Sequence, residues 1–417
     1  MLKKLITFIK TYRVQLLIAG VSLACYLIFV YAGRHFFTHD TVVYQMKWWD
    51  YLAQHGWRGI ATLNDPATGL NGDYTTIWYA IIVIFTKLQL YPQFPIEFSI
   101  KLIAVFASLL SAAAIFFIAK HFRPKSPFLP VIAASMTPFL PLFSMDLLKT
   151  NLTDSLFIAF CLWSFYFFVR NKKGLAWFLV ALGACFKPMA VYLVPVFIFF
   201  YIKDFATYTL REKLAPLWGI PAVVLCSIPH VLAGGSFLNG IINPILGRND
   251  TEAVMPWFWL IPTSNNFTSA GVPLEMKSML YGLLFFVIFM TMFFILKYVK
   301  KENQTRVGLA ILPTISIMMC FYLLPSQHET YFAMAGIFAL VGFFILPNKL
   351  LFVNVVAINS FLFCMYLFGL TWWLETPTRI LPNEQMGVLF VGLIIFNYYL
   401  LYRYSVFYKL SKSADNI

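Results

Sequence analysis

Residues 174–202 read GLAWFLVALGACFKPMAVYLVPVFIFFYI, an apolar run that a single charged residue, Lys187, interrupts. A membrane-crossing helix needs about 20 apolar residues, so the run is too long for one crossing. Pro188 follows the lysine and lacks the N–H that a helix interior requires, so the helix is expected to break there. The stretch therefore predicts two short membrane helices, 174–188 and 189–202, joined at Lys187.

The whole chain shares this apolar character. Of its 417 residues 60% are hydrophobic and 12% are charged, which excludes a soluble globular protein. The net charge of +14 comes from short basic clusters between apolar runs. That pattern is typical of orientation signals and headgroup contacts, so nucleic acid is not an expected partner. The six cysteines lie inside apolar runs without CxxC spacing, so neither a disulfide framework nor a zinc site is predicted.

The hydrophobic segments predict an all-α polytopic membrane protein with about twelve transmembrane helices, in a single domain over residues 1–417. The first apolar stretch ends in Tyr31 and Ala32 without a small-residue cleavage site, so it is expected to be a retained helix rather than a signal peptide. The expected spans are 14–32, 97–119, 127–145, 152–169, 174–188, 189–202, 214–232, 278–296, 307–324, 330–346, 350–370 and 386–402.

The charges divide between the two sides of this topology. One side holds 21 of the 31 Lys and Arg residues and four of the 17 acids. The positive-inside rule makes that side cytoplasmic and places both termini there. The acidic residues, and with them the groups able to do chemistry, then face outward. We therefore expect a multi-pass protein of a plasma membrane whose active site is extracytoplasmic.

Two outer loops are long, namely 33–97 and 233–277. The first contains an apolar segment, Ile77–Tyr91, which reaches only about 22 Å as a helix and is too short to cross the core of about 30 Å. It predicts a helix in the outer leaflet. The aromatic residues of this loop are expected at the level of the headgroups; they are Trp48, Trp49, Tyr51, Trp57, Tyr74, Trp78 and Tyr79.

Asp40 is the first candidate for chemistry, because it follows the first span and precedes an amphipathic helix. A carboxylate beside lipid can have a raised pKa and act as a general base toward a hydroxyl. The alternative is an N-cap of the following helix. Asp73 likewise precedes an apolar helix, with capping as its default role.

A second polar group lies between the third and fourth spans: Asp146, Lys149, Asn151 and Asp154. Charges at membrane depth are usually paired or functional, and an ion pair of Lys149 with Asp146 or Asp154 is the simpler interpretation. Lys187 has no acid near it in the sequence, so it either contacts a lipid-linked phosphate or extends to the headgroups.

His328 and Glu329 begin the tenth span from outside. They could hold a phosphate or orient a base, and the alternative is an ordinary helix start. The pair lacks the HExxH spacing of a zinc hydrolase, and there is no Walker A loop, strand-borne GxGxxG or GxSxG.

These segments together resemble the GT-C superfamily of integral membrane glycosyltransferases, most closely the bacterial relatives of the second GPI mannosyltransferase. The matching motifs are Asp40, Tyr44, Trp48, Leu52 and Gly56 at four-residue steps, Asp73-Tyr74-Thr75-Thr76, Asp154-Ser155-Leu156-Phe157, Lys187-Pro188 with Val194-Pro195, and His328-Glu329-Thr330-Tyr331. The family has prolines at 75 and 76, a Gln before Asp154 and an Arg at 330, and this chain departs from it there.

The resemblance implies a GT-C-like fold and inverting transfer of a sugar from a polyprenyl-phosphate donor to an extracytoplasmic glycan or glycolipid. Asp40 would be the general base. The negative charge that develops on the leaving phosphate would be stabilised by Lys149, Lys187, Arg248 and His328. Substrate-binding or structural roles would fall to Tyr44, Trp48, Asp73, Tyr74, Asp154, Glu329 and Tyr331. No cofactor is required, although Asp40 with Asp154 could bind a divalent metal.

Other functions stay open at this point. A transporter or flippase of lipid-linked saccharides is the main alternative, but the chain shows no internal repeat of the kind that transporters often have. A polysaccharide polymerase or ligase and a non-catalytic membrane protein are further alternatives.

Overall fold

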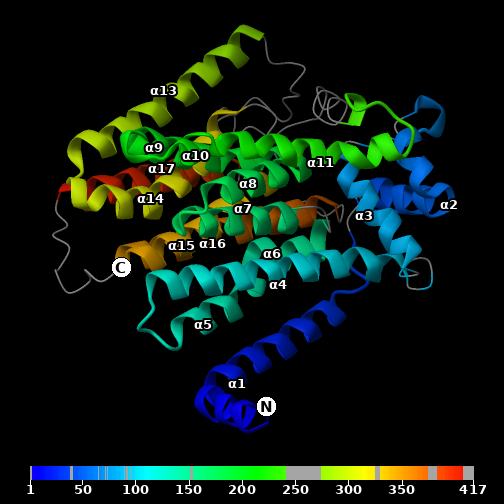
Figure 1. Cartoon of the computed structure of the whole chain (residues 1–417), viewed down its shortest axis with the longest axis horizontal. Helices are drawn as coiled ribbons and strands as arrows, with labels where there is room; N and C mark the ends of the chain where they lie inside the picture. The colour runs from blue at the N-terminus through cyan, green and yellow to red at the C-terminus, as the bar shows by residue number, and fades with distance from the viewer. Residues whose placement is uncertain are drawn as a thin grey trace.

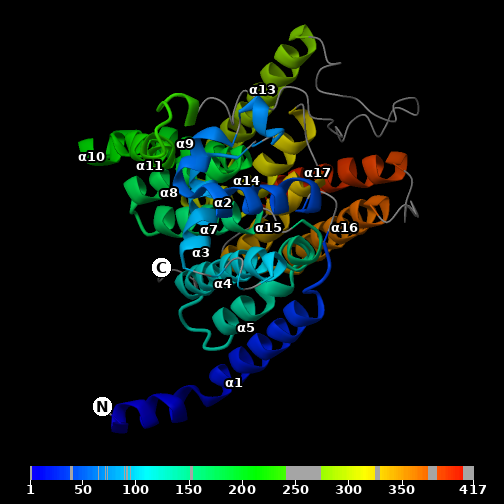
Figure 2. The same ribbon diagram turned by 90° about the vertical axis from the view of Figure 1, so that its right-hand side faces the viewer.

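The structure is a computed structural model that describes residues 2–37, 41–63, 65–70, 72, 74–88, 90, 93, 95–150, 154–240, 274–324, 329–373 and 383–406. The described residues form helices, turns and short connections, with no strand among them (Figures 1 and 2). This confirms the all-α prediction.

The α-helices follow one another along the chain with short 3-10 or π-helical segments between them. Their bounds are α1 Leu2–Ala32, α2 Met46–Thr62, α3 Thr76–Lys87, α4 Ile96–Phe122, α5 Leu129–Met136, α6 Pro141–Met145, α7 Asp154–Val169, α8 Lys173–Phe186, α9 Val194–Asp204, α10 Leu210–Lys213, α11 Gly219–Leu232, α13 Leu274–Tyr298, α14 Lys301–Leu323, α15 Ala333–Ile345, α16 Lys349–Trp373 and α17 Asn383–Val406. The π-helical segments are η1 Thr41–Gln45 and η4 Asp146–Thr150, and the 3-10 segments are η2 Pro66–Thr68, η3 Thr137–Phe139, η5 Pro188–Leu193, η6 Phe205–Thr207, η7 Ala215–Trp218 and η10 Glu329–Phe332.

Nine helical stretches among the described residues are long and apolar enough to cross a membrane, and each coincides with a predicted span. They are Lys10–Ala32, Phe98–Phe122, Leu129–Leu148, Pro188–Thr207, Ala215–Leu232, Ser278–Tyr298, Lys301–Leu323, Lys349–Tyr366 and Gln385–Ser405. The other three predicted spans fall on the shorter apolar helices α7, α8 and α15. The chain is a polytopic membrane protein.

The centre of the bundle is α14, whose apolar stretch is 89% buried inside the protein. It packs against α15 so closely that a Cβ at Gly342 would lie 2.2 Å from the carbonyl oxygen of Ala310. Small residues are what allow helix backbones in membranes to approach this closely. At the edges, α1 and α13 lean away from the bundle (Figures 1 and 2). Many apolar side chains are exposed in their parts from Tyr12 to Tyr31 and from Met279 to Tyr298.

One end of the bundle carries α2 and α3, and we call it the α3 end (Figure 1). The helix α3 is only 12 residues long, which confirms that this apolar segment is shorter than a membrane span. It packs against α2 and α11. Most of the aromatic residues that were expected at the headgroup level are buried in the protein core: Trp48, Trp49, Tyr74, Trp78 and Tyr79. Because α2 and α3 face one another, their aromatic sides pack together and not against lipid.

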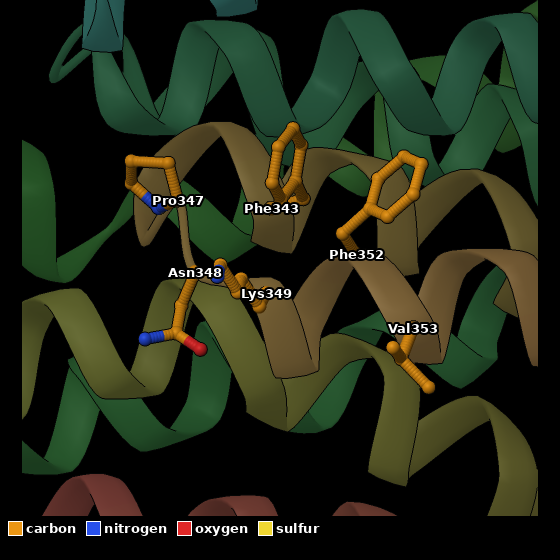
Figure 3. Close-up of a pocket in the computed structure, with 6 residues that line it drawn as sticks. All are labelled: Phe343, Pro347, Asn348, Lys349, Phe352 and Val353. Atoms are coloured by element: carbon orange, nitrogen blue, oxygen red, sulfur yellow. The ribbon is translucent and has the colours of Figure 1, made fainter.

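The opposite end of the bundle contains connections between consecutive helices, among them the one that follows α4. We call it the Arg123 end. Arg123 follows α4 and its guanidinium donates to the carbonyls of Phe344 and Ile345 at 2.9 and 3.2 Å. A shallow apolar pocket lies at this end, at the connection between α15 and α16 (Figure 3). Its lining residues are Phe343, Pro347, Asn348, Lys349, Phe352 and Val353.

A polar clamp at the Arg123 end joins the start of α8 to α10. The Lys173 ammonium donates to Glu212 at 2.6 Å and lies 3.7 Å from the centre of the Tyr208 ring. Thr209 and Glu212 form a capping box at the start of α10. Hydrogen bonds from Lys173 and then from Thr209 lower the pKa of the Glu212 carboxyl to about 2.

This clamp predicts a pH dependence of stability. Because the pKa of Glu212 is lower in the folded protein than its ordinary value of 4.5, its contribution is fully present above about pH 4.5. It is lost as the pH falls toward about 2. We expect the difference in unfolding temperature between wild type and Glu212→Gln to be constant from pH 7 to pH 5 and to shrink below that. A difference that grows on acidification would contradict the clamp.

Candidate active site

A buried ion pair marks the α3 end of the bundle. The ammonium of Lys187 donates to Oδ1 of Asp154, and the two side chains are 3% and 1% exposed. Asp154 begins α7, whereas Lys187 follows α8 in an extended conformation that Pro188 favours over a helical one. The pair therefore joins the ends of two neighbouring helices, and its members lie 33 residues apart in the sequence.

The structure corrects the sequence-based interpretation of Lys187. Extension to the headgroups is excluded, because the ammonium points inward to a carboxylate. Asp154, one of the two acids considered as a partner for Lys149, pairs with Lys187. A buried charge pair is retained only where its attraction and its hydrogen bonds offset the cost of desolvation.

Two tyrosines from distant parts of the chain flank the ion pair. Tyr331, in η10, places its ring centre 5.0 Å from the Lys187 nitrogen, a cation–π distance. The phenol of Tyr74 also interacts electrostatically with Lys187. Both tyrosines are buried, at 7% and 5% exposure. Four of the five motifs in the sequence thus contribute a residue to the ion pair or to its immediate surroundings.

The turn before α3 fixes Tyr74 in this position. The hydroxyl of Thr75 donates to the carbonyl of Cys185 in the last turn of α8, and the hydroxyl of Thr76 donates to the carbonyl of Cys226 in α11 at 2.6 Å. The backbone N–H of Tyr74 donates to the Tyr79 hydroxyl at 3.1 Å. Threonines at these two positions therefore anchor the turn to both helices through bonds that prolines could not make.

An aromatic wall extends from Tyr74 into α2. The Trp48 ring meets the rings of Tyr74 and Tyr79 edge to face, with centres 5.6 and 5.7 Å apart. Tyr44 lies next to Trp48, with ring centres 6.3 Å apart, and is 43% exposed. Tyr44, Trp48 and Leu52, which are spaced four residues apart, thus lie on one side of the helical segment, and Trp48 and Leu52 are buried.

The start of α7 is held by a second carboxylate. Oδ2 of Asp146 accepts hydrogen bonds from the backbone N–H of Ser155 at 3.1 Å and from its hydroxyl at 2.5 Å. Asp146 is fully buried. Because it satisfies an N–H in the first turn of α7, it stabilises the helix end from which Asp154 extends toward Lys187.

Lys101 is a structural cation that the sequence did not reveal. It lies in the first turns of α4 with 1% exposure, and its ammonium donates to the carbonyls of Gly33, Phe36 and Leu147 at 2.5, 3.0 and 3.1 Å. These carbonyls belong to the segment that leads to Asp40 and to the segment η4 that carries Lys149. The available signal was a lysine four residues after Glu97 in a long apolar helix, since a charge within such a helix is rarely without a specific role.

Replacing Lys101 with methionine is expected to destabilise the protein by about 1–3 kcal/mol, because three carbonyls lose their donor in a buried place. Amide hydrogen exchange should increase over residues 33–36 and 146–148. The exposed Lys87 in the last turn of α3 provides the matched control, since Lys87→Met removes a lysine from the same end of the bundle. Equal effects of the two substitutions would contradict the role of Lys101.

Several predicted site residues lie outside the described part of the structure. These are Asp40, Asp73, Arg248 and His328, together with the side chains of Lys149 and Glu329. Among the residues that the structure does describe, no three His, Cys, Asp or Glu side chains form a group able to hold a metal ion.

One known protein family matches this part of the chain. Residues 76–232 match the family of dolichyl-phosphate-mannose-protein mannosyltransferases, which is of the GT-C type. The chain resembles a GT-C membrane glycosyltransferase. The match covers less than half of the chain, from the start of α3 to the end of α11, and it includes both members of the ion pair. A comparison with curated proteins found no significant match.

The match supports a glycosyltransferase that takes its sugar from a lipid-linked donor and works in a membrane. It agrees with the superfamily that the motifs of the sequence indicated. The matched family is that of the protein mannosyltransferases, whereas the motifs pointed to relatives of a GPI mannosyltransferase within the same superfamily.

Proposed function

We propose that the protein transfers a hexose from a polyprenyl-phosphate donor to a glycan or glycolipid outside the cytoplasm, with inversion at the anomeric carbon. The observation that carries the proposal is the geometry of Lys187. An ammonium has three N–H donors, and among the described residues Asp154 accepts one of them. We infer that a ligand which accepts hydrogen bonds and carries negative charge, as a phosphate does, could bind the ammonium through its further donors.

The place of Lys187 also suits a donor that is part lipid. Lys187 lies between α8 and the apolar segments η5 and α9 that follow it. A phosphate bound there would have apolar helix surfaces beside it for a prenyl chain. Tyr331 and Tyr74 lie next to the ammonium and could present hydroxyl donors to the same phosphate. Arg248, His328 and Lys149 would add further positive charge.

The chemistry then needs few groups. Asp40 takes the proton from the acceptor hydroxyl while that oxygen attacks the anomeric carbon, and the bond to the phosphate oxygen breaks on the opposite face. Charge develops on the departing phosphate, and Lys187 is fixed in place by Asp154 before the reaction begins. Such preorganised charge is usually the largest contribution to catalysis of this kind. The remaining predicted residues, Tyr44, Trp48, Asp73 and Glu329, would line or support the acceptor side.

The proposed reaction needs no cofactor. The alternative of a divalent metal held by Asp40 and Asp154 fits poorly, because one oxygen of Asp154 already accepts from an ammonium, and a second cation beside Lys187 would be repelled.

The positive-inside distribution gives the orientation that we propose, with the Arg123 end and both termini in the cytoplasm and the α3 end outside, in a plasma membrane. Nucleotide sugars are normally confined to the cytoplasm, so an outward site requires a donor that has been carried across as a lipid. This requirement and the buried lysine lead to the same class of donor by separate arguments.

Binding of the product polyprenyl phosphate tests the role of Lys187. Lys187→Gln is made together with Asp154→Asn, so that no buried charge is left without its counterion and the amide at 187 can still donate to residue 154; the fold is therefore expected to persist. The dissociation constant for polyprenyl phosphate, measured by tryptophan fluorescence in nanodiscs, should rise about 10- to 100-fold, as expected for a lost hydrogen bond to a charged group. An unchanged constant in a folded variant would remove Lys187 from the donor site.

A further inference from the structure

Two cysteines that are far apart in the sequence meet at the α3 end. Cys185 lies in the last turn of α8 and Cys226 lies in α11, and these two helices pack against each other. The two thiols are close enough to interact electrostatically. Both are free thiols in the structure.

The backbones of the two cysteines are held beside each other independently of the thiols. The carbonyl of Cys185 accepts from Thr75 and that of Cys226 accepts from Thr76, and these threonines are consecutive residues. A disulfide requires Cα atoms about 4.4–6.8 Å apart and side chains that point toward each other. The consecutive threonine anchors and the packing of α8 on α11 bring the two backbones to the same place, and the two thiols interact there.

We propose that Cys185 and Cys226 form a reversible disulfide that links α8 to α11 beside the Lys187–Asp154 pair. The proposal takes one element from the proposed function, namely that the α3 end faces outward. Disulfides form and persist on that side of a plasma membrane, whereas the cytoplasm keeps thiols reduced.

The oxidant required is a disulfide, either of a thiol oxidase or of a small molecule. The Cys185 thiolate attacks one sulfur of the oxidant, which releases the other sulfur as a thiolate and leaves a mixed disulfide on Cys185. The Cys226 thiolate then attacks the Cys185 sulfur and releases the second thiolate of the oxidant. Two electrons and the two thiol protons end on the oxidant, as a dithiol for a thiol oxidase or as two thiols for a small molecule, and the protein gains one disulfide bond.

The bond would restrain the candidate active site. Cys185 lies two residues before Lys187, and its carbonyl anchors Thr75, the neighbour of Tyr74. In the oxidised form α8, α11 and the turn before α3 would be joined covalently as well as by hydrogen bonds. The spacing of the cysteines in the sequence predicted no disulfide, because the pair depends on two helices that meet only in the folded protein.

The test is disulfide mapping on the full-length protein in lipid nanodiscs, treated with 4,4′-dithiodipyridine, an apolar disulfide that can reach buried thiols. After alkylation and digestion, mass spectrometry should find the Cys185 and Cys226 peptides joined in the majority of molecules, and dithiothreitol should separate them. The oxidised protein should also unfold at a higher temperature than the reduced protein.

Two variants make the result specific. Cys185→Ser should abolish the joined peptide, and Cys161→Ser, which removes a buried thiol of α7, should leave it unchanged. Recovery of Cys185 and Cys226 as free thiols, or as two separate mixed disulfides, would overturn the proposal. Sugar transfer is not measured, so this result stands apart from the success or failure of the proposed function.

Discussion

Asp154→Leu is expected to destabilise the folded protein by about 3–5 kcal/mol, because it leaves the Lys187 ammonium buried without its counterion. The measurement is thermal or denaturant unfolding in detergent, followed by tryptophan fluorescence. The effect should be much smaller when Lys187 is replaced as well, since Asp154→Leu/Lys187→Met exchanges the buried charges for apolar side chains.

The double variant separates stability from function. If Lys187 stabilises the leaving phosphate, the well-folded double variant should still lose sugar transfer by about 10²–10³-fold, the usual cost of one preorganised donor. A purely structural ion pair would give the opposite result, in which activity returns together with stability. Recovery of both in the double variant would therefore exclude Lys187 from the chemistry.

Asp40→Asn is expected to lower the turnover number by about 10²–10⁴-fold, because the amide cannot accept the proton of the acceptor hydroxyl. The affinity for the lipid-linked donor and the unfolding temperature should change little. Asp50→Asn is the matched control, since Asp50 is an exposed acid of α2 in the same outer segment. The measurement is steady-state transfer from a polyprenyl-phosphate hexose with purified protein.

A variant that retains full turnover would move the base to another carboxylate. If activity falls only together with the unfolding temperature, Asp40 caps the helix that follows it, which is the alternative that the sequence left open. The pH profile distinguishes the two roles, because loss of a general base removes the acidic limb of the rate profile while loss of a cap does not.

The helices could be predicted because apolar runs of sufficient length have few other stable arrangements in a bilayer. The short helix α3 was also predictable, since a segment of its length cannot cross the core. The burial of its aromatic residues was not. A ring that faces the headgroups and a ring that faces a neighbouring helix leave the same pattern in the sequence, and only the packing of α2 on α3 decides between them.

The candidate site shows a similar division. The motifs named Tyr74, Asp154, Lys187 and Tyr331, and the structure places the two tyrosines around the ion pair. The pairing itself could not be predicted, because spacing along the chain offered Asp146 and Asp154 as partners for Lys149, whereas Asp154 pairs with a lysine from the end of the next helix. Lys101 was missed for the same reason, since its three acceptors lie in two other segments. The role of Asp40 stays a prediction.

The most direct test of the central claim is sugar transfer by the purified protein in nanodiscs, offered a panel of polyprenyl-phosphate hexoses and the corresponding nucleotide sugars with a mixture of envelope glycans and glycolipids. We predict release of polyprenyl phosphate and formation of a glycosylated product from at least one lipid-linked donor, and none from nucleotide sugars. Transfer from nucleotide sugars alone, or movement of the lipid-linked saccharide across the bilayer without cleavage, would contradict the account.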